Sequence, residues 1–145
     1  MHELPRQLSV EELDELFEGP TRLTEELARR PDPLGQARAL LADLPEEAQI
    51  EALNTHPRIG ARGGSELSVR EQGSDDDPAV LGALRRLNKA YEDKFGFRFV
   101  VFVNERPRAE ILSVLRERLQ HERDQELGTG LDELVAIALD RWQTR

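Results

Sequence analysis

Residues 77–103, DPAVLGALRRLNKAYEDKFGFRFVVFV, decide the fold class, because they set the most regular helical pattern of the chain directly before its one strand-like run. Asp77 and Pro78 are typical of a helix cap and first turn, and Gly96 is typical of a helix end. Between them, apolar residues recur at helical spacing: Leu81, Leu84, Leu87, Tyr91 and Phe95. The pattern predicts a long amphipathic helix from Pro78 to Phe95.

The strand-like run covers residues 97–103 and is rich in aromatic and β-branched side chains. No second run of similar strength is available to pair with it, and an isolated strand would leave its backbone groups without hydrogen bonds. We therefore expect a buried extended or helical-turn segment threaded between helices. The sequence predicts an all-α fold, a compact single-domain bundle of about seven to eight helices over residues 1–145.

The rest of the chain supplies the other helices. Ser9 to Glu12 is a capping box, and Pro45 and Pro107 are predicted to be the first residues of two helices. Gly128 and Gly130 weaken the last helix and indicate either its true start or a close helix contact. The expected helices span 10–18, 23–30, 34–43, 45 to about 56, a short one from Ser68, then 78–95, one from Pro107, and one carrying Leu127 to Trp142.

Composition narrows the classes of function. The net charge of −9 argues against nucleic-acid binding, which needs a basic face. No apolar run approaches the roughly 20 residues that span a bilayer, and the first residues lack the regions of a signal peptide, so we expect a cytoplasmic protein that acts away from membranes. All basic residues except Lys89 and Lys94 are arginines, which suit bidentate capture of a carboxylate. Genomic base composition explains most of them more simply.

One stretch is suited to chemistry near neutral pH. His56-Pro57-Arg58-Ile59-Gly60 sets an imidazole before a proline and a glycine turn, and Ser68 and Glu71 follow shortly after. A histidine and a glutamate brought together can transfer protons. Two structural explanations compete with this one. A histidine at a helix C-terminus is stabilised by the helix dipole, and Ser68-x-x-Glu71 fits a capping box. Spacing alone does not separate the two readings of His56, and for Ser68-x-x-Glu71 the pattern favours the cap.

The sequence lacks the residues or the patterns that other kinds of catalytic site require. With no cysteine and three dispersed histidines, the chain offers no cluster of zinc ligands. Lys89 and Lys94 fall among polar residues on an exposed helix face, which argues against a Schiff base. Residues 60–64 do not match a phosphate loop, and no strand-turn-helix elbow surrounds Ser68. We therefore expect no metal and no organic cofactor, and either acid–base catalysis or no catalysis.

A collinear series of motifs covers about the last two-thirds of the chain: His56-Pro57-Arg58-Ile59-Gly60, Ser68, Glu71-Gln72, Leu87-Asn88, Tyr91, Phe95-Gly96-Phe97, Phe99-Val100-Val101, Ile111-Leu112, Arg118-Leu119, Glu126, Ile137-Ala138 and Arg141. The series resembles the 2-oxo-4-hydroxy-4-carboxy-5-ureidoimidazoline (OHCU) decarboxylases of urate breakdown. The first third departs from that family, since residues 19–23 read Gly-Pro-Thr-Arg-Leu where the family usually has a Ser-Pro-Trp-like element.

The resemblance implies an all-helical, often dimeric enzyme that decarboxylates a small molecule, OHCU, to S-allantoin without metal or organic cofactor. It implies that His56 and Glu71 are the catalytic pair and that backbone groups of residues 97–101 line the same pocket. The implied substrate-binding residues are Pro57, Ser68, Gln72, Phe99, Val100 and Arg141. Two alternatives stay open, a non-catalytic helical module that binds a partner and a decarboxylase of a related ureido or imidazoline acid.

Overall fold

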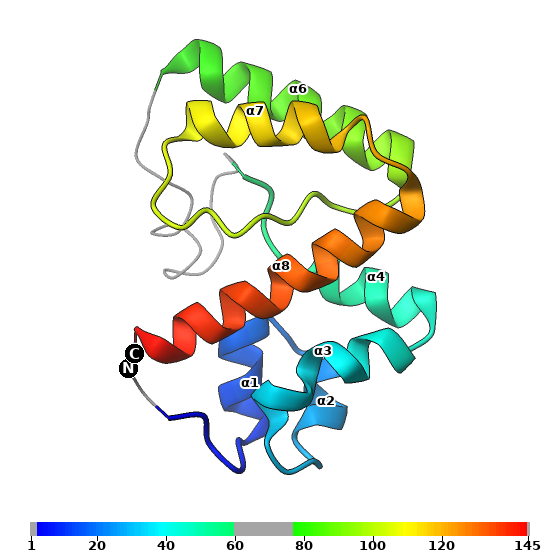
Figure 1. Ribbon diagram of the computed structural model, residues 1–145, viewed down its shortest axis with the longest axis vertical. Coiled ribbons are helices and arrows are strands. Elements are labelled where there is room, and N and C mark those ends of the chain that lie inside the picture. Colours follow the sequence, from blue (N-terminus) through cyan, green and yellow to red (C-terminus); the bar gives the residue numbers. More distant parts are fainter. Residues whose placement is uncertain (1–2, 60–76, 145) are drawn as a thin grey trace.

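The computed structural model describes residues 3–59 and 77–144, and within them the chain forms seven helices and no strand (Figure 1). The all-α prediction is confirmed. The helices are α1 (Val10–Phe17), α2 (Arg22–Leu27), α3 (Pro33–Asp43), α4 (Glu46–Asn54), α6 (Pro78–Phe95), α7 (Arg108–Arg118) and α8 (Arg123–Gln143). The short helix expected from Ser68 lies outside the described residues. In the described ranges, no helix has both the length and the apolar character that crossing a membrane requires.

Local capping signals set several helix ends. Ser9 Oγ accepts a hydrogen bond from Glu12 N at 3.1 Å, and Glu12 Oε1 accepts one from Ser9 N at 3.0 Å, so the predicted capping box forms. Asp77 caps α6 through the backbone N–H of Ala79 at 2.9 Å. Gly96 ends α6 in the left-handed region, with φ of 83°, a conformation that glycine adopts without steric cost.

The prediction for the two helix-starting prolines is wrong by one position. Pro45 and Pro107 are the N-cap residues of α4 and α7, with ψ of 153° in both, and the first helical residues are Glu46 and Arg108. Their carbonyls accept the first backbone bonds of each helix, so the missing N–H of proline is not needed.

Helix α8 connects the two parts of the molecule. Figure 1 shows it running from the pair α6–α7 to the group formed by α1, α2, α3 and α4. It packs against α1, α3 and α4, and α6 packs against α7. Its buried face carries Leu131, Leu134 and Ala138 in the described core. Since α8 spans 21 residues, its last turns reach the first helix of the chain.

Residues 97–103 run beneath α6 and α7 with neither helix nor strand, and most of their side chains are buried. The expectation of a buried segment between helices is confirmed. Arginine side chains replace a partner strand as donors to its carbonyls. Arg118 Nη1 donates to Val100 O at 2.7 Å, and Arg106 donates to the carbonyls of Phe102 and Val103 at 2.6 and 3.0 Å. The segment is thus fixed without a sheet.

Gly128 and Gly130 both lie inside α8, so the alternative that they mark its start is wrong. A close contact exists at Gly130, where a Cβ would lie 3.3 Å from Leu53 Cδ2 of α4, whereas a Cβ at Gly128 meets nothing within 4 Å.

This difference predicts unequal effects of alanine at the two positions. We expect Gly128→Ala to raise the free energy of unfolding by about 1 kcal/mol, because alanine favours the helix. Gly130→Ala should gain clearly less, because its methyl group has to displace Leu53. Urea unfolding of the two variants provides the measurement, and equal gains would contradict the close contact.

Candidate active site

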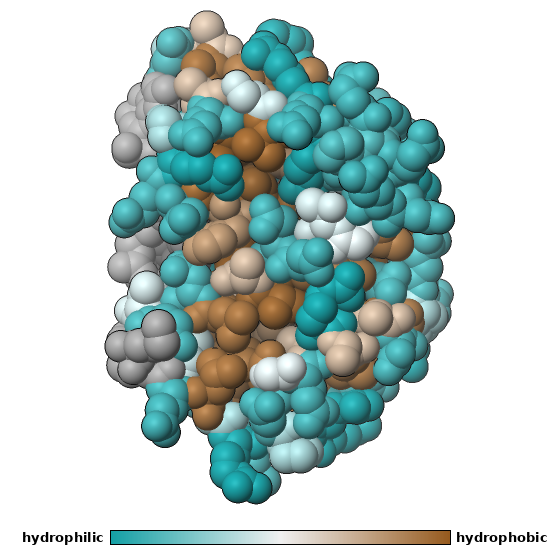
Figure 2. Space-filling view, in the orientation of Figure 1, coloured by the Kyte–Doolittle hydropathy of each residue, from teal (hydrophilic) through white to brown (hydrophobic). Residues whose placement is uncertain are grey.

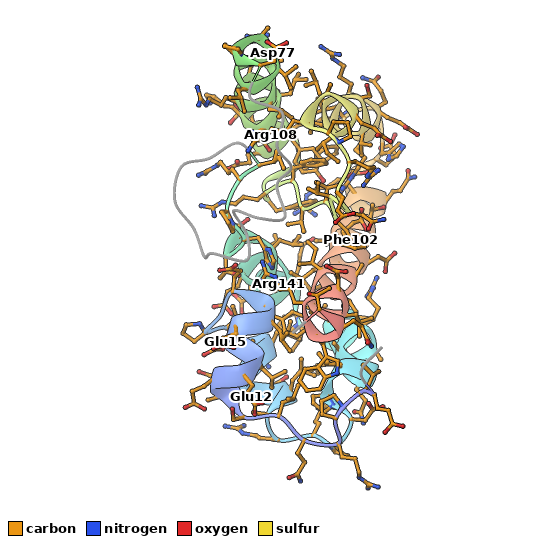
Figure 3. All side chains as sticks on the ribbon, turned by 90° about the vertical axis from the view of Figure 1, so that its left-hand side faces the viewer. Glu12, Glu15, Asp77, Phe102, Arg108 and Arg141 are labelled. Carbon is orange, nitrogen blue, oxygen red and sulfur yellow. The ribbon has the colours of Figure 1, made fainter. Side chains whose placement is uncertain are left out.

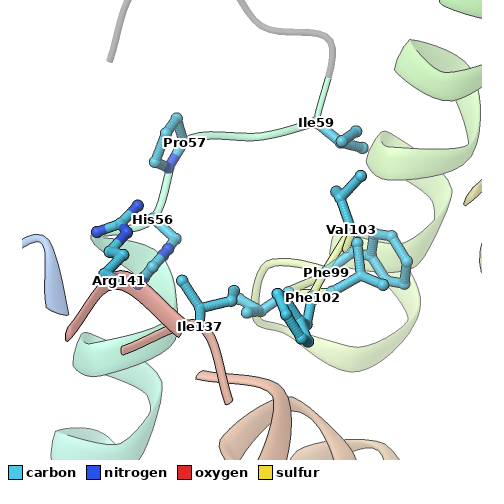
Figure 4. Close-up of a pocket in the computed structure, with 10 residues that line it drawn as sticks. His56, Pro57, Ile59, Phe99, Phe102, Val103, Ile137 and Arg141 are labelled. Carbon is cyan, nitrogen blue, oxygen red and sulfur yellow. The ribbon is translucent and has the colours of Figure 1, made fainter. Parts of the chain in front are cut away.

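A pocket opens where the end of α4, the buried segment before α7 and the last turns of α8 meet. Its lining includes five of the residues expected from the sequence: His56, Pro57, Phe99, Val100 and Arg141. Figure 4 shows His56, Pro57 and Arg141 on one side of the pocket and Phe99 on the other. They come from three separate parts of the sequence, the furthest apart being His56 and Arg141, and the fold brings them to one place.

His56 follows α4 by two residues, so the proline after it does coincide with the end of that helix. Its backbone is held at both ends, since His56 N donates to Leu53 O at 3.2 Å and Arg98 Nη1 donates to His56 O at 3.0 Å. The side chain is 6% exposed. Within the described part of the chain, the buried ring nitrogen Nε2 has no hydrogen-bond partner. A buried polar atom in this condition is costly unless a ligand or another group satisfies it.

Burial decides the charge of His56. Removal from water lowers its pKa from the ordinary 6.5 to about 4, and the nearby Arg141 guanidinium lowers it further, while the Glu18 carboxylate acts in the opposite direction. The ring is therefore neutral at pH 7 and able to accept a proton. A histidine held only by the dipole of a helix C-terminus would instead favour the charged form. The structural explanation based on the dipole does not fit this environment.

The lowered pKa of His56 predicts a loss of stability in acid. Between pH 6.5 and 4 the unfolded chain binds a proton at His56 that the folded chain does not, so the free energy of unfolding falls as the pH falls through this window. The shift corresponds to roughly 3 kcal/mol, present in full above pH 6.5. His56→Gln should lose this part of the pH dependence. Urea unfolding from pH 8 to 4 gives the free energy of unfolding of the wild type and of His56→Gln as a function of pH. We expect the two curves to run parallel above pH 6.5 and to converge or cross below it. Curves that stay parallel down to pH 4 would contradict the lowered pKa.

Arg141 is almost completely buried and ties α8 to the end of α1. Its Nη1 donates to the carbonyls of Glu15 and Leu16 at 3.1 and 3.2 Å, and its Nη2 lies 3.1 Å from Glu18 Oε1. Figure 3 shows Arg141 between the two helices. Glu18 is the C-cap of α1 and has a φ of 58°, in the left-handed region. The end of α1 thus fixes the guanidinium at the edge of the pocket.

Some residues of the pocket were not among the site residues predicted from the sequence. Ile59, Phe102, Val103 and Ile137 also line the pocket, and Ile137 was accessible to prediction because it stands one helical turn before Arg141. Glu18 was not, because its role depends on how α1 packs against α8. The pocket wall is mostly apolar, so the few polar groups in it determine how a ligand is oriented.

Two backbone N–H groups of the pocket wall are available as hydrogen-bond donors. Val100 and Val101 are buried, and among the described residues no hydrogen bond from their N–H groups is found. This arrangement is compatible with the expectation that backbone groups of residues 97–101 line the pocket. Ser68, Glu71 and Gln72 lie outside the described residues, so their positions relative to His56 stay predictions.

Other chemistries can be compared with the described residues. Lys89 and Lys94 are exposed on α6, as expected, which leaves no buried lysine there for a Schiff base. No group of three or more metal-binding side chains occurs in residues 3–59 and 77–144. Absence of a cofactor remains a prediction.

Comparisons with known proteins agree on one family. A family model described as OHCU decarboxylase matches residues 2–143. The 2-oxo-4-hydroxy-4-carboxy-5-ureidoimidazoline decarboxylase of Halalkalicoccus jeotgali is 34% identical over 113 residues, covering 74% of this chain and 64% of that protein. The uric acid degradation bifunctional protein of Bacillus subtilis is 36% identical over 101 residues, covering 63% of this chain and 20% of that protein. The chain thus spans less than two-thirds of the length of either relative.

Solved structures show the same similarity. A crystal structure of OHCU decarboxylase in the presence of (S)-allantoin superposes with a TM-score of 0.66 at 25% identity, covering 92% of this chain and 88% of that one. The all-helical architecture is therefore shared across the described elements.

Proposed function

Because the chain belongs to the OHCU decarboxylase family, we propose that it decarboxylates OHCU to S-allantoin in urate degradation without a cofactor. The observation that carries this proposal is the pocket in which the buried, unpartnered Nε2 of His56 lies beside Arg141. A neutral base next to a fixed cation suits an anionic substrate that must lose CO2 and gain a proton. The names of the relatives support the substrate.

Arg141 is proposed to bind a carboxylate or ring oxygen of OHCU. Its guanidinium is already oriented by α1, so little conformational entropy is lost when the substrate binds. A cation close to the carboxylate also offsets the unfavourable field of a chain with net charge −9.

His56 is proposed to manage the protons. As CO2 leaves, the bonding electron pair stays on the ring carbon and passes into the adjacent imine. His56 removes the proton of the hydroxyl group and then delivers a proton to one face of the resulting carbanion. Delivery to one face yields a single enantiomer. Glu71 is proposed to orient the imidazole, and Ser68 and Gln72 to hydrogen-bond the ureido and ring amide groups.

The test feeds the purified protein with OHCU made in place by uricase and the following hydrolase. We expect circular dichroism to follow the appearance of S-allantoin. The substrate also decays unaided, so the handedness of the product, not loss of substrate, is decisive. A racemic product at the uncatalysed rate would reject the enzyme and favour the binding module. Turnover of a related ureido acid in place of OHCU would support the other alternative, a decarboxylase of a related ureido or imidazoline acid.

A homodimer is proposed as the working form. Figure 2 shows apolar side chains gathered in a band down one face of the molecule. Val135, Leu139 and Trp142 recur at helical spacing on α8 and are only partly buried. Such a band is typical of an interface between subunits. The cytoplasmic location expected from the sequence remains a prediction.

A further inference from the structure

A network of buried polar side chains lies behind the pocket wall, outside the lining of the pocket. Glu126 is fully buried and accepts hydrogen bonds at one oxygen from Tyr91 Oη and Arg118 Nε, both at 2.7 Å. Its other oxygen lies 2.7 Å from His121 Nδ1. Burial raises the pKa of Tyr91, so its hydroxyl remains a donor. Three elements, α6, α7 and α8, are joined through this one carboxylate.

Arg118 carries the network to the pocket wall. Its Nη1 donates to Val100 O at 2.7 Å, and its guanidinium carbon lies 4.6 Å from the centre of the Phe99 ring. Glu126 fixes the guanidinium from one side, and the aromatic face fixes it from the other. The carbonyl of Val100 is therefore kept pointing toward the Arg118 guanidinium, which is itself held in place by Glu126 and Phe99.

The direction of Val100 O determines the direction of a neighbouring donor. The peptide unit is planar, and none of the described peptide bonds here is cis, so the N–H of Val101 points opposite to the C=O of Val100. Arg118 binds that carbonyl and does not line the pocket, whereas Val100 and Val101 do. The N–H of Val101 points away from Arg118, so it is the polar group of this peptide unit that is left to face the pocket. Val101 lines the pocket and is 8% exposed, and its N–H has no partner among the described residues.

We propose that Arg118 is a positioning residue, which holds the Val100–Val101 peptide so that the Val101 N–H donates a hydrogen bond to an oxygen of the bound ureido-imidazoline. The proposal rests on the proposed function. Arg118 itself does not touch the ligand. It acts through the peptide, and Glu126 and Tyr91 act through Arg118.

The test measures the Val101 amide directly. In a ¹⁵N-labelled protein titrated with S-allantoin, we expect the Val101 N–H resonance to shift downfield on binding. In Arg118→Lys we expect that shift to disappear and the Kd for S-allantoin to rise by about tenfold, the size expected for one lost hydrogen bond. The KM for OHCU should rise with the Kd. Lysine can reach Glu126 or Val100 O but lacks the fork that binds both.

Arg123→Lys is the matched control. Arg123 donates to the carbonyl of Phe95 at 3.0 Å, lies 5.6 Å from the centre of the Phe97 ring and pairs with Glu46, so its contacts are of the same three kinds. They lie away from the pocket. We expect this variant to keep the wild-type Kd and the Val101 shift.

If Arg118→Lys does not fold, replacement of Val101 by its α-hydroxy acid removes the N–H and also makes the Val100 carbonyl a weaker acceptor for Arg118. Both changes act on the proposed contact, so the Kd should again rise by about tenfold. An unchanged Kd in either variant overturns the proposal, and so does a wild-type Val101 resonance that ignores S-allantoin while resonances near His56 respond. A wild-type protein that forms S-allantoin under those conditions leaves the proposed function intact. A protein that neither binds nor forms S-allantoin overturns both.

Discussion

Replacing His56 by alanine is expected to lower kcat/KM for S-allantoin formation by about 10²–10⁴-fold, the usual contribution of general acid–base catalysis. The ring contributes the one buried side-chain nitrogen of the described pocket lining that lacks a partner. Alanine removes the group that takes and returns the proton, and the carbanion is then protonated from water on either face. The product should lose its handedness together with the rate.

The measurement follows circular dichroism in the coupled assay, with far-ultraviolet spectra to establish that the variant is folded. Thr55→Ala is the matched control, because Thr55 is the preceding residue, bonds the carbonyl of Ala52 at 3.0 Å and does not line the pocket. We expect it to retain wild-type activity. An alanine variant of His56 that still makes S-allantoin at the wild-type rate would remove His56 from the mechanism.

Replacing Arg141 by methionine is expected to destabilise the protein by about 3–5 kcal/mol, because it removes the buried guanidinium that pairs with the Glu18 carboxylate. The same change deprives the carbonyls of Glu15 and Leu16 of a donor. Both effects loosen the attachment of α1 to α8. The variant should also lose activity, since Arg141 lines the pocket.

Urea unfolding at pH 7 measures the loss of stability. Arg38→Met is the control, because Arg38 forms an exposed pair with Asp132 between α3 and α8. Removal of such a surface pair costs less than about 1 kcal/mol. If the two variants lost similar amounts of stability, the anchoring of α1 by Arg141 would be rejected.

Signals carried by neighbouring residues predicted the structure well. The capping box at Ser9, the cap at Asp77 and the stop at Gly96 act within one helical turn, so their effects are visible in the sequence. The prolines at 45 and 107 were misplaced by one residue, because proline suits both the N-cap and the first helical position. The absence of a partner for residues 97–103 correctly excluded a sheet within the described ranges.

Interactions between distant residues were beyond the sequence. Spacing placed His56 beside a turn but did not separate a catalytic role from a helix-end role. Burial, which the sequence does not show, favours the neutral ring, and the catalytic role stays a proposal. Arg141 was associated with the site only through the family resemblance, and its attachment to Glu18 depends on the packing of α1 against α8. The buried Glu126 was one matched residue among many, and only the fold places it behind Val100.

The buried segment at residues 97–103 has a consequence for handling the protein. Its sequence, Phe-Arg-Phe-Val-Val-Phe-Val, is strongly prone to form strands and carries one charge. In the native state, α6, α7 and the arginines keep its backbone from other chains. Heat or denaturant that detaches α7 would present this stretch to copies of itself, and cross-β association would then compete with refolding. Arg98 and Arg106 interrupt and flank the run as gatekeepers, and both also bind native backbone carbonyls, so their removal is expected to worsen aggregation on both counts.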